Sequence, residues 1–262
     1  MRLALAQMEP LWENKKGNFE ASLKFLQEAK EKQADFVVFP EMSMTGFSMH
    51  PEKIGEDREN SETLSYFQKQ AKEFGLYIGI GYVEYRLPKS YNSFAVISPQ
   101  GEILADYQKI HPFTFGTESV HYTGGDHIVA CKVKEFTVAP FICYDLRFPE
   151  IFQIASEKAQ LILVPANWPA ERRDHFITLL RARAIENQCY IAGVNRTGHA
   201  RTFTYSGDSM IIDPFGKVIA DAGDGEKLIV ADLNLPLVEQ YRAEFPAKND
   251  RRKEFYVLKC TQ

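Results

Sequence analysis

The sequence predicts an α/β fold that forms one domain with mixed sheets. Short apolar runs bounded by glycine, proline or polar turns alternate along the chain with longer segments whose apolar residues recur at helical spacing. No Pro-, Gly- or Ser-rich linker divides the 262 residues, which favours a single domain over two smaller ones. Hydrophobic residues at 45% and charged residues at 25% are ordinary for a globular chain, which excludes disordered and fibrous classes.

Apolar patterns in the first half of the chain predict five strands and two helices. The first strand alternates and then runs apolar, and the helix after it carries Phe19, Leu23 and Leu26 at helical spacing. The second helix has Ser61 at its start and Gly75 at its end, which are typical capping residues. We expect strands at 2–8, 35–40, 76–83, 92–97 and 103–109, and helices at 14–33 and 61–75.

The second half of the chain repeats this alternation of strands and helices. A proline, Pro149, opens one helix, and the segment Pro214-Phe215-Gly216 marks a hairpin turn. We expect strands at 136–143, 161–165, 189–194 and 228–233, a hairpin of 209–213 with 218–222, and helices at 149–158 and 173–188.

Charge and hydropathy exclude several classes of function. The chain has 31 Lys and Arg against 35 Asp and Glu, a net charge of -4, whereas a protein that binds nucleic-acid phosphates needs a basic excess. No run of about 18 apolar residues occurs, so we expect no transmembrane helix and no membrane partner. Gly79 and Gly81 lack the third glycine of a dinucleotide-binding loop, so they are interpreted as strand-packing positions.

The cysteines and histidines indicate the compartment and the absence of a cofactor. Cys131, Cys143, Cys189 and Cys260 form no CxxC pair and no dense framework, which favours free thiols in a reducing cytosol. The apolar stretch at residues 3–6 is too short for a secretory signal, so we expect a cytoplasmic protein. The six histidines show no HExxH-like spacing, and we therefore expect neither a metal nor another cofactor.

Three residues with reactive side chains follow predicted strands. Glu41 follows DFVVFP, Lys109 follows ILADYQ, and Cys143 follows FTVAPFI. Because α/β sheets place reactive groups beyond the carboxyl ends of their strands, a thiol nucleophile, a carboxylate base and an oxyanion-stabilising ammonium form a workable covalent catalyst. Each residue alone also has an ordinary interpretation, as a solvated carboxylate, a surface ammonium or a small buried hydrophobic residue.

The residues around these three positions carry a family resemblance. The segments are FPEM at 39–42 with TGF at 45–47, YQKIH at 107–111, and ICYDLRFPE at 142–150. In this order, with 68 residues from Glu41 to Lys109 and 34 from Lys109 to Cys143, they resemble the nitrilase (carbon–nitrogen hydrolase) superfamily. The resemblance extends from the first strand to about Tyr256.

The resemblance implies a four-layer α-β-β-α sandwich and a Glu–Lys–Cys triad. It makes Glu41 the general base, Lys109 the cation beside the oxyanion and Cys143 the nucleophile. It also implies that the backbone N–H of Tyr144 is a second oxyanion donor. Glu118, in the segment GTES, matches a further family glutamate that orients the lysine or assists proton transfer.

Four further segments resemble the omega-amidase branch of this superfamily. They are ANWP at 166–169, RARAIENQ at 181–188, Asn195-Arg196 and YSGDS at 205–209. Members of this branch hydrolyse the distal amide of 2-oxo-dicarboxylic acid monoamides, so their pocket needs a cation for the substrate carboxylate. Arg172, at the start of a predicted helix, is the candidate, and its alternatives are a surface arginine or a role for Arg173.

Several neighbouring residues are candidates for the pocket wall or for support of the nucleophile. Phe47, Phe115 and Trp168 are candidate wall residues, although aromatic side chains are more common in cores. Asp145 and Arg147 are expected to brace the turn at the nucleophile by hydrogen bonds. Arg183 and Glu186, three residues apart on a predicted helix, are interpreted as a packing or surface pair.

Other functions in the same fold remain open from the sequence. A hydrolase of N-carbamoyl amines or nitriles is the nearest alternative to an omega-amidase. A non-catalytic scaffold or thiol sensor is the alternative from another class, and the intact Glu41, Lys109 and Cys143 speak against it.

The C-terminal segment completes the expected organisation. We expect a single domain at 1–256, with 235–262 as a C-terminal extension. The resemblance implies a homodimer, and we expect the helix at 173–188 and the apolar residues of 235–256 to lie near its interface. The alternative is that this segment packs on its own subunit.

Overall fold

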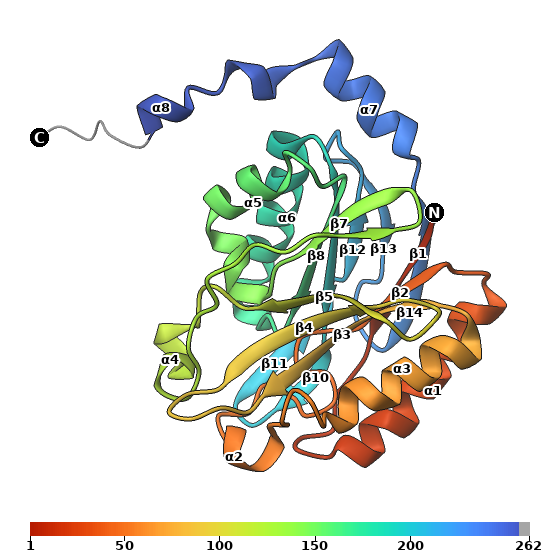
Figure 1. Cartoon of the computed structure of the whole chain (residues 1–262), viewed down its shortest axis with the longest axis vertical. Helices are drawn as coiled ribbons and strands as arrows, with labels where there is room; N and C mark the ends of the chain where they lie inside the picture. Colours follow the sequence, from red (N-terminus) through yellow and green to blue (C-terminus); the bar gives the residue numbers. More distant parts are fainter. Residues whose placement is uncertain (257–262) are drawn as a thin grey trace, which may run out of the picture.

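The computed structural model describes residues 1–256 and contains two six-stranded mixed sheets that face each other (Figure 1). In the first sheet, whose strand order is β14-β1-β2-β3-β4-β5, the three central strands β1, β2 and β3 run parallel. In the second, whose order is β13-β12-β9-β8-β7-β6, strands β7, β8 and β9 run parallel. A separate hairpin joins β10 and β11.

The strand bounds follow the sequence expectations closely. The first sheet consists of β1 (Arg2–Gln7), β2 (Phe36–Val38), β3 (Tyr77–Glu84), β4 (Tyr91–Ile97), β5 (Ile103–Gln108) and β14 (Lys227–Asp232). The second consists of β6 (Cys131–Val133), β7 (Phe136–Pro140), β8 (Leu161–Ala166), β9 (Tyr190–Asn195), β12 (Met210–Ile212) and β13 (Val218–Asp221). The hairpin consists of β10 (Thr197–Ala200) and β11 (Phe203–Ser206).

Four helices lie on the outer faces of the two sheets (Figure 1): α1 (Lys15–Glu31) and α3 (Glu62–Phe74) cover the first sheet, and α5 (Pro149–Ala155) and α6 (Arg173–Asn187) cover the second. The helices α7 (Leu235–Glu244) and α8 (Lys253–Tyr256) belong to the C-terminal segment, and α2 (Pro51–Ile54) and α4 (Glu118–His121) are one-turn helices. The expected capping of α3 is confirmed, because the Ser61 side chain accepts a hydrogen bond from Leu64 N and Gly75 closes the helix with φ 66°.

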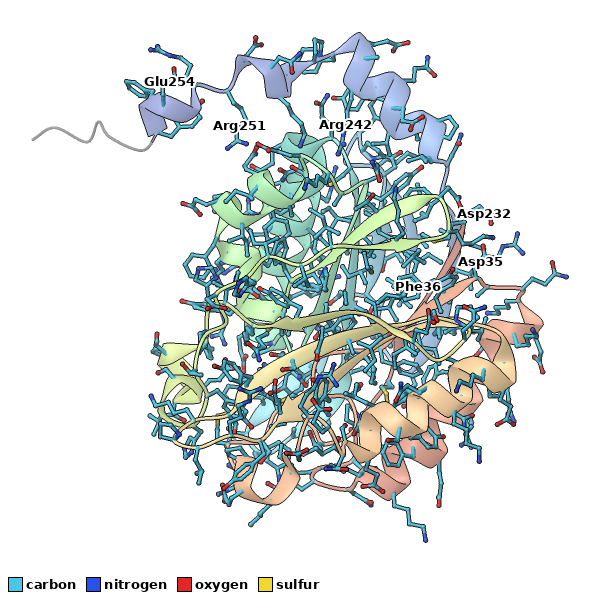
Figure 2. All side chains as sticks on the ribbon, in the orientation of Figure 1. Asp35, Phe36, Asp232, Arg242, Arg251 and Glu254 are labelled. Carbon is cyan, nitrogen blue, oxygen red and sulfur yellow. The ribbon has the colours of Figure 1, made fainter. Side chains whose placement is uncertain are left out.

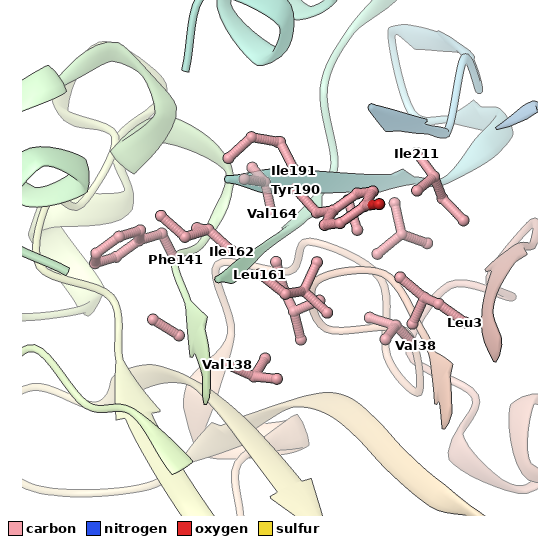
Figure 3. Packing of buried hydrophobic residues seen from close by; sticks show 14 of the residues in the cluster. Leu3, Val38, Val138, Phe141, Leu161, Ile162, Val164, Tyr190, Ile191 and Ile211 are labelled. Carbon is pink, nitrogen blue, oxygen red and sulfur yellow. The ribbon is translucent and has the colours of Figure 1, made fainter. Parts of the chain in front are cut away.

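The cores between the layers confirm the four-layer α-β-β-α sandwich. Leu3 and Val38 of the first sheet pack in one buried cluster with Val138 and Leu161 of the second (Figure 3). The alternate strand residues, such as Ala4, pack in another cluster against α1 and α3. Because successive strand residues point to opposite faces, the central strands of the first sheet contribute to both clusters. In the second sheet, residues of both strand faces join the first cluster, which also includes Phe152 of α5 and Leu180 of α6.

Two glycines of β3 confirm the strand-packing interpretation. A Cβ atom at Gly81 would lie 2.6 Å from Met42 N and 3.0 Å from Glu41 Cα, so only glycine lets β3 approach the segment that carries Glu41. A Cβ atom at Gly79 would lie 2.8 Å from the ring of Phe94. Gly81 therefore lets the segment after β2 lie close to β3, and Gly79 leaves room for the Phe94 ring.

The structure departs from the sequence expectations at short elements, at one strand end and in the C-terminal segment, where the ten-residue helix α7 was not expected. The strand expected at 136–143 ends at Pro140, because the chain turns before Cys143 and continues as a 3₁₀ turn over Cys143–Arg147. The short strands β6, β10 and β11 and the one-turn helices α2 and α4 were not expected. Elements of three or four residues contain too few positions to show a period.

The C-terminal segment packs back on its own chain. Val238 of α7 is fully buried, and Arg242 donates hydrogen bonds to the carbonyls of Ala159 and Gln188 (both 2.9 Å). Figure 2 shows Arg242 and Arg251 along this segment, which runs across the ends of α5 and α6. Phe245, Phe255 and Tyr256 remain exposed, so the segment has apolar surface left over. Within residues 1–256 no helix has the length and apolar character that a membrane crossing requires.

Candidate active site

The structure brings together the four side chains that the sequence motifs single out. Glu41 follows β2, Lys109 follows β5 and Cys143 follows β7, so two of them come from the first sheet and the thiol from the second. Glu118 opens the short helix α4. Glu41 and Glu118 are fully buried and Lys109 is 1% exposed, whereas Cys143 is half-buried and lines a cavity.

The Lys109 ammonium lies between the two carboxylates. Its Nζ atom donates to Glu41 Oε1 at 3.0 Å and to Glu118 Oε2 at 2.9 Å. Burial by itself lowers the pKa of Lys109, but the charges of Glu118 and Glu41 outweigh burial and raise it above its usual value. Burial, with Glu41 adding to it, also raises the pKa of Glu118, and the charge of Lys109 offsets only part of this rise. The lysine therefore stays a cation throughout the neutral range.

Two asparagines that the sequence argument did not assign complete the hydrogen bonding of Glu41. Asn92 Nδ2 donates to Glu41 Oε1 at 2.7 Å and to Glu118 Oε1 at 2.9 Å. Asn167 donates from its backbone N–H to Glu41 Oε2 at 2.8 Å. Asn167 belongs to the quoted ANWP segment, which is the signal that pointed to it, whereas Asn92 stands in a strand with no local signal. Both carboxylate oxygens of Glu41 are thus held in fixed positions.

Cys143 stands on a strained turn that Asp145 holds. Cys143 has φ 47°, a left-handed conformation that is unfavourable for a residue with a side chain. The buried Asp145 carboxylate accepts hydrogen bonds from Ile142 N at 2.9 Å and from Tyr107 OH at 2.8 Å. It also accepts one from His111 N at 3.0 Å. The predicted bracing role of Asp145 is therefore visible in its contacts.

A second support for this turn comes from α6. The guanidinium of Arg183, which is 5% exposed, donates to the Leu146 carbonyl at 2.7 Å and forms an ion pair with Glu186 at 3.0 Å. The packing interpretation of Arg183 and Glu186 is confirmed, and the pair connects α6 to the end of the nucleophile turn. Arg147 lies with its guanidinium 4.8 Å from the Trp168 ring centroid and contacts His175.

The surroundings of the Cys143 thiol favour its protonated form. Burial raises its pKa well above the usual value, the charge of Glu41 raises it further, and Lys109 offsets only part of the shift.

The cavity in front of Cys143 has a volume of about 190 Å³ and is lined mainly by aromatic and cationic side chains. Phe47, Trp168, Arg172 and Tyr144 line it, as the sequence expectations require. Phe115 is not among the lining residues and is 86% exposed, so its expected place in the wall disagrees with the structure. Phe113 lines the cavity instead, because the chain turns through a 3₁₀ helix over Thr114–Gly116.

The two candidate arginines differ in their surroundings. The Arg172 guanidinium lies 5.8 Å from the Phe113 ring centroid, and no ion pair or hydrogen bond to another protein group engages it within residues 1–256. Arg173 forms a bidentate ion pair with Asp208, at 2.7 and 2.9 Å, and does not line the cavity. Arg172 is therefore the cation of this pair that is free to meet an anionic ligand.

The other described thiols lie away from this cavity. Cys131 and Cys189 are buried, and burial raises the pKa of both to about 12. Cys260 falls outside the residues that the structure describes. In the described part of the chain, no cluster of three His, Cys, Asp or Glu side chains is arranged to hold a metal ion.

Sequence comparison assigns the class of protein to which this fold and site belong. The carbon–nitrogen hydrolase family model matches residues 2–243, and the chain belongs to this family.

Individual relatives point to amidases. The chain is 34% identical to a 2-oxoglutaramate amidase of Bacillus subtilis over 88% of this chain and 90% of that protein. It is 35% identical to the omega-amidase YafV of Yersinia enterocolitica over 97% of both chains.

A solved structure with the same fold supports the family assignment. A carbon–nitrogen hydrolase superfamily protein from Xanthomonas campestris, with an arsenic adduct in its active site, matches at TM-score 0.90 and 31% identity over 97% of both chains. A carbon–nitrogen hydrolase from Helicobacter pylori shares the fold at TM-score 0.91 over 98% of this chain, with 24% identity.

Proposed function

We propose that this protein is a thiol amidase that hydrolyses the distal amide of small 2-oxo-dicarboxylic acid monoamides, such as 2-oxoglutaramate and 2-oxosuccinamate. The products are the dicarboxylate and ammonia. The observation that carries the proposal is one cavity that contains both the Cys143 thiol, beside Glu41 and Lys109, and Arg172, which pairs with no carboxylate in the described part of the chain. The names of the Bacillus and Yersinia relatives agree with this substrate class.

In the first half-reaction the enzyme is acylated. Cys143 Sγ attacks the amide carbonyl carbon while Glu41 accepts the thiol proton. Lys109 and the Tyr144 N–H stabilise the oxyanion. The backbone N–H of Asp145 donates the first hydrogen bond of the 3₁₀ turn, so the Tyr144 N–H, which precedes it, has no acceptor within the turn and can donate to the substrate. The carbon–nitrogen bond then breaks, Glu41 returns the proton to the leaving nitrogen, and ammonia departs from a thioester.

In the second half-reaction water hydrolyses the thioester. Glu41 takes a proton from water as the water oxygen attacks the thioester carbon. The carbon–sulfur bond then breaks. The proton returns to Cys143 Sγ, which restores the starting state. Glu118 acts through Lys109, whose Nζ atom it holds at 2.9 and 3.1 Å, and it keeps the ammonium pointed at the site.

The cavity wall accounts for the shape of the proposed substrate. Arg172 binds the carboxylate at the end remote from the amide, and it stands directly before α6, where the helix dipole also favours an anion. Phe47 and Trp168 flank the short carbon chain between the two groups. The proposal includes no metal and no other cofactor.

A panel of substrates tests the function directly. Ammonia release is measured for 2-oxoglutaramate, 2-oxosuccinamate, simple neutral amides, nitriles and N-carbamoyl amino acids. We expect the highest kcat/KM for the two oxo-amides. A higher kcat/KM for a nitrile or a carbamoyl amino acid would assign the chain to that alternative, and no turnover of any substrate would favour the scaffold or thiol sensor.

The proposal extends to assembly and location. We place the protein in the cytoplasm as a homodimer of single-domain chains, each with residues 1–256 as its domain and 235–262 as its C-terminal extension, and with α6 and residues 235–256 near the interface. The exposed Phe245, Phe255 and Tyr256 support such an interface, because large apolar groups left on the surface favour burial against a partner. Light scattering should give about twice the 30.0 kDa chain mass, and a fully active monomer would contradict the dimer.

A further inference from the structure

We propose that Arg201, at the tip of the β10–β11 hairpin, is a second anchor for the distal carboxylate and acts together with Arg172. This inference rests on the proposed function and deepens it, because it concerns how the same cavity selects anionic amides. The sequence motifs gave no indication of this residue.

The first observation is the charge of the cavity wall. The lining residues include the cations Lys109, Arg147, Arg172 and Arg201 and no aspartate or glutamate. Lys109 is held by the two buried glutamates, and Arg147 contacts His175. The guanidinium groups of Arg172 and Arg201 form no hydrogen bond or ion pair with any other group in residues 1–256. The cavity thus has two cations that pair with no carboxylate of the described residues, and the carboxylate of a ligand would supply the missing anion.

The second observation is the backbone conformation of Arg201. Ala200 pairs with Phe203, so Arg201 and Thr202 form a two-residue hairpin loop. Arg201 has φ 52° at the first loop position, where hairpins with this sign of φ favour glycine. An arginine in this position is unfavourable for the backbone, and such strain is a recurrent feature of ligand-binding residues.

The third observation is the direction in which the side chain is held. The Arg201 guanidinium lies 4.6 Å from the ring centroid of Trp12, and both residues line the cavity. Arg172 lies over a different ring, that of Phe113. Each cation is therefore held against its own aromatic surface without losing its hydrogen-bond donors, which stay free for a carboxylate.

The geometry of a carboxylate fits two such partners. Its two oxygens accept about four hydrogen bonds, and one guanidinium fork satisfies only part of this capacity. The hairpin, drawn in cyan in Figure 1, belongs to neither six-stranded sheet, so it adds a recognition group without altering the site at the strand ends.

The test compares a charged and a neutral substrate of matched length. Steady-state constants for glutaramate and for the diamide glutaramide are measured for the wild type, Arg201→Gln and Arg201→Gly. We expect Arg201→Gln to raise KM for glutaramate about tenfold to a hundredfold, the range for loss of a charge-assisted hydrogen bond, with a much smaller change for glutaramide. The kcat for glutaramate should change less than KM.

Controls separate binding from folding. Arg201→Gly suits the φ of this position, so its thermal unfolding temperature should not fall, although its KM for glutaramate should rise as in Arg201→Gln. Lys24→Gln removes an exposed cation of α1 that does not line the cavity, and it should leave the constants for both substrates unchanged. If Lys24→Gln raises KM for glutaramate as much as Arg201→Gln, the effect is general charge loss and the inference is wrong.

Two outcomes distinguish the failure of this inference from the failure of the proposed function. A wild type that prefers glutaramate, with the preference intact in Arg201→Gln, would overturn the role of Arg201 and leave the function standing. A wild type without any preference for glutaramate or for 2-oxoglutaramate over neutral amides would overturn the function and the Arg201 role together.

Discussion

The floor and the mouth of the cavity are built on opposite principles. At the floor, Lys109 lines the cavity and donates to Glu41 and Glu118, which are buried behind it, and Asn92 and Asn167 donate to the carboxylates. At the mouth, the Arg172 and Arg201 guanidinium groups lie against aromatic rings, and no carboxylate among residues 1–256 pairs with them. The two regions therefore differ in what they need from the substrate. The hydrogen bonds of the floor are in place without substrate, whereas in the proposed function the substrate carboxylate balances the charge of the mouth.

This difference separates the expected kinetic effects of substitutions. Changes at the floor remove interactions that form or strengthen in the transition state, so they should lower kcat. Changes at the mouth remove contacts to an unreacting carboxylate, which are equal in the ground and transition states, so they should raise KM. A substitution that violates this division would break the comparison.

The largest effect is expected for Cys143→Ala, which should abolish turnover. The variant keeps the fold, since the turn is held by Asp145 and not by the thiol. In the wild type, a short iodoacetamide pulse followed by mass spectrometry should label Cys143 before Cys131 and Cys189, which are buried, and activity should fall in proportion. Full activity of Cys143→Ala would remove the nucleophile from the mechanism.

Glu41→Gln should lower kcat by about 10²–10⁴, the usual cost of losing a general base. The amide is nearly isosteric and can still accept from Asn92 and Lys109, so the fold should persist by circular dichroism. A kcat within a few-fold of the wild type would assign the base to another group.

At the mouth, Arg172→Ala should raise KM for oxo-dicarboxylate amides by about tenfold or more, because it removes a charge-assisted contact. The KM for neutral amides should change far less, and kcat should be nearly constant for both. An equal rise in KM for charged and neutral substrates would show that Arg172 shapes the cavity without binding the carboxylate.

The smallest expected effect is a change in the pKa of the Cys143 thiol at the floor of the cavity. The Cys143 pKa is raised by burial and then by the charge of Glu41, so Glu41→Gln should lower it while Lys109 remains a cation. Because a lower pKa favours the charged form, thiolate absorbance should appear at lower pH in the variant than in the wild type. The opposite shift would mean that Glu41 stabilises a thiolate at rest and is not poised to accept its proton.

The sequence predicted the floor far better than the mouth, and the reason is physical. Glu41, Lys109 and Cys143 follow strands whose apolar runs are visible, so their meeting at the sheet edges can be inferred from pattern and resemblance. Arg201 and Phe113 are positioned by a two-residue hairpin loop and a 3₁₀ turn, which leave no periodic signal. Because this turn leaves no signal, the sequence predicts Phe115 for the cavity wall, whereas the ring that lines the cavity is that of Phe113, two residues earlier.

Partition of the acyl group tests the central claim, a Cys143 thioester, most directly. Hydroxylamine is supplied as a second nucleophile during turnover of glutaramate and of monomethyl glutarate, the ester with methoxide in place of the amide nitrogen. Neither substrate has a ketone that hydroxylamine would convert to an oxime. One shared thioester predicts the same ratio of hydroxamate to acid from both substrates, and no product from Cys143→Ala. Ratios that depend on the leaving group, or hydroxamate formed by Cys143→Ala at the wild-type rate, would contradict the covalent mechanism.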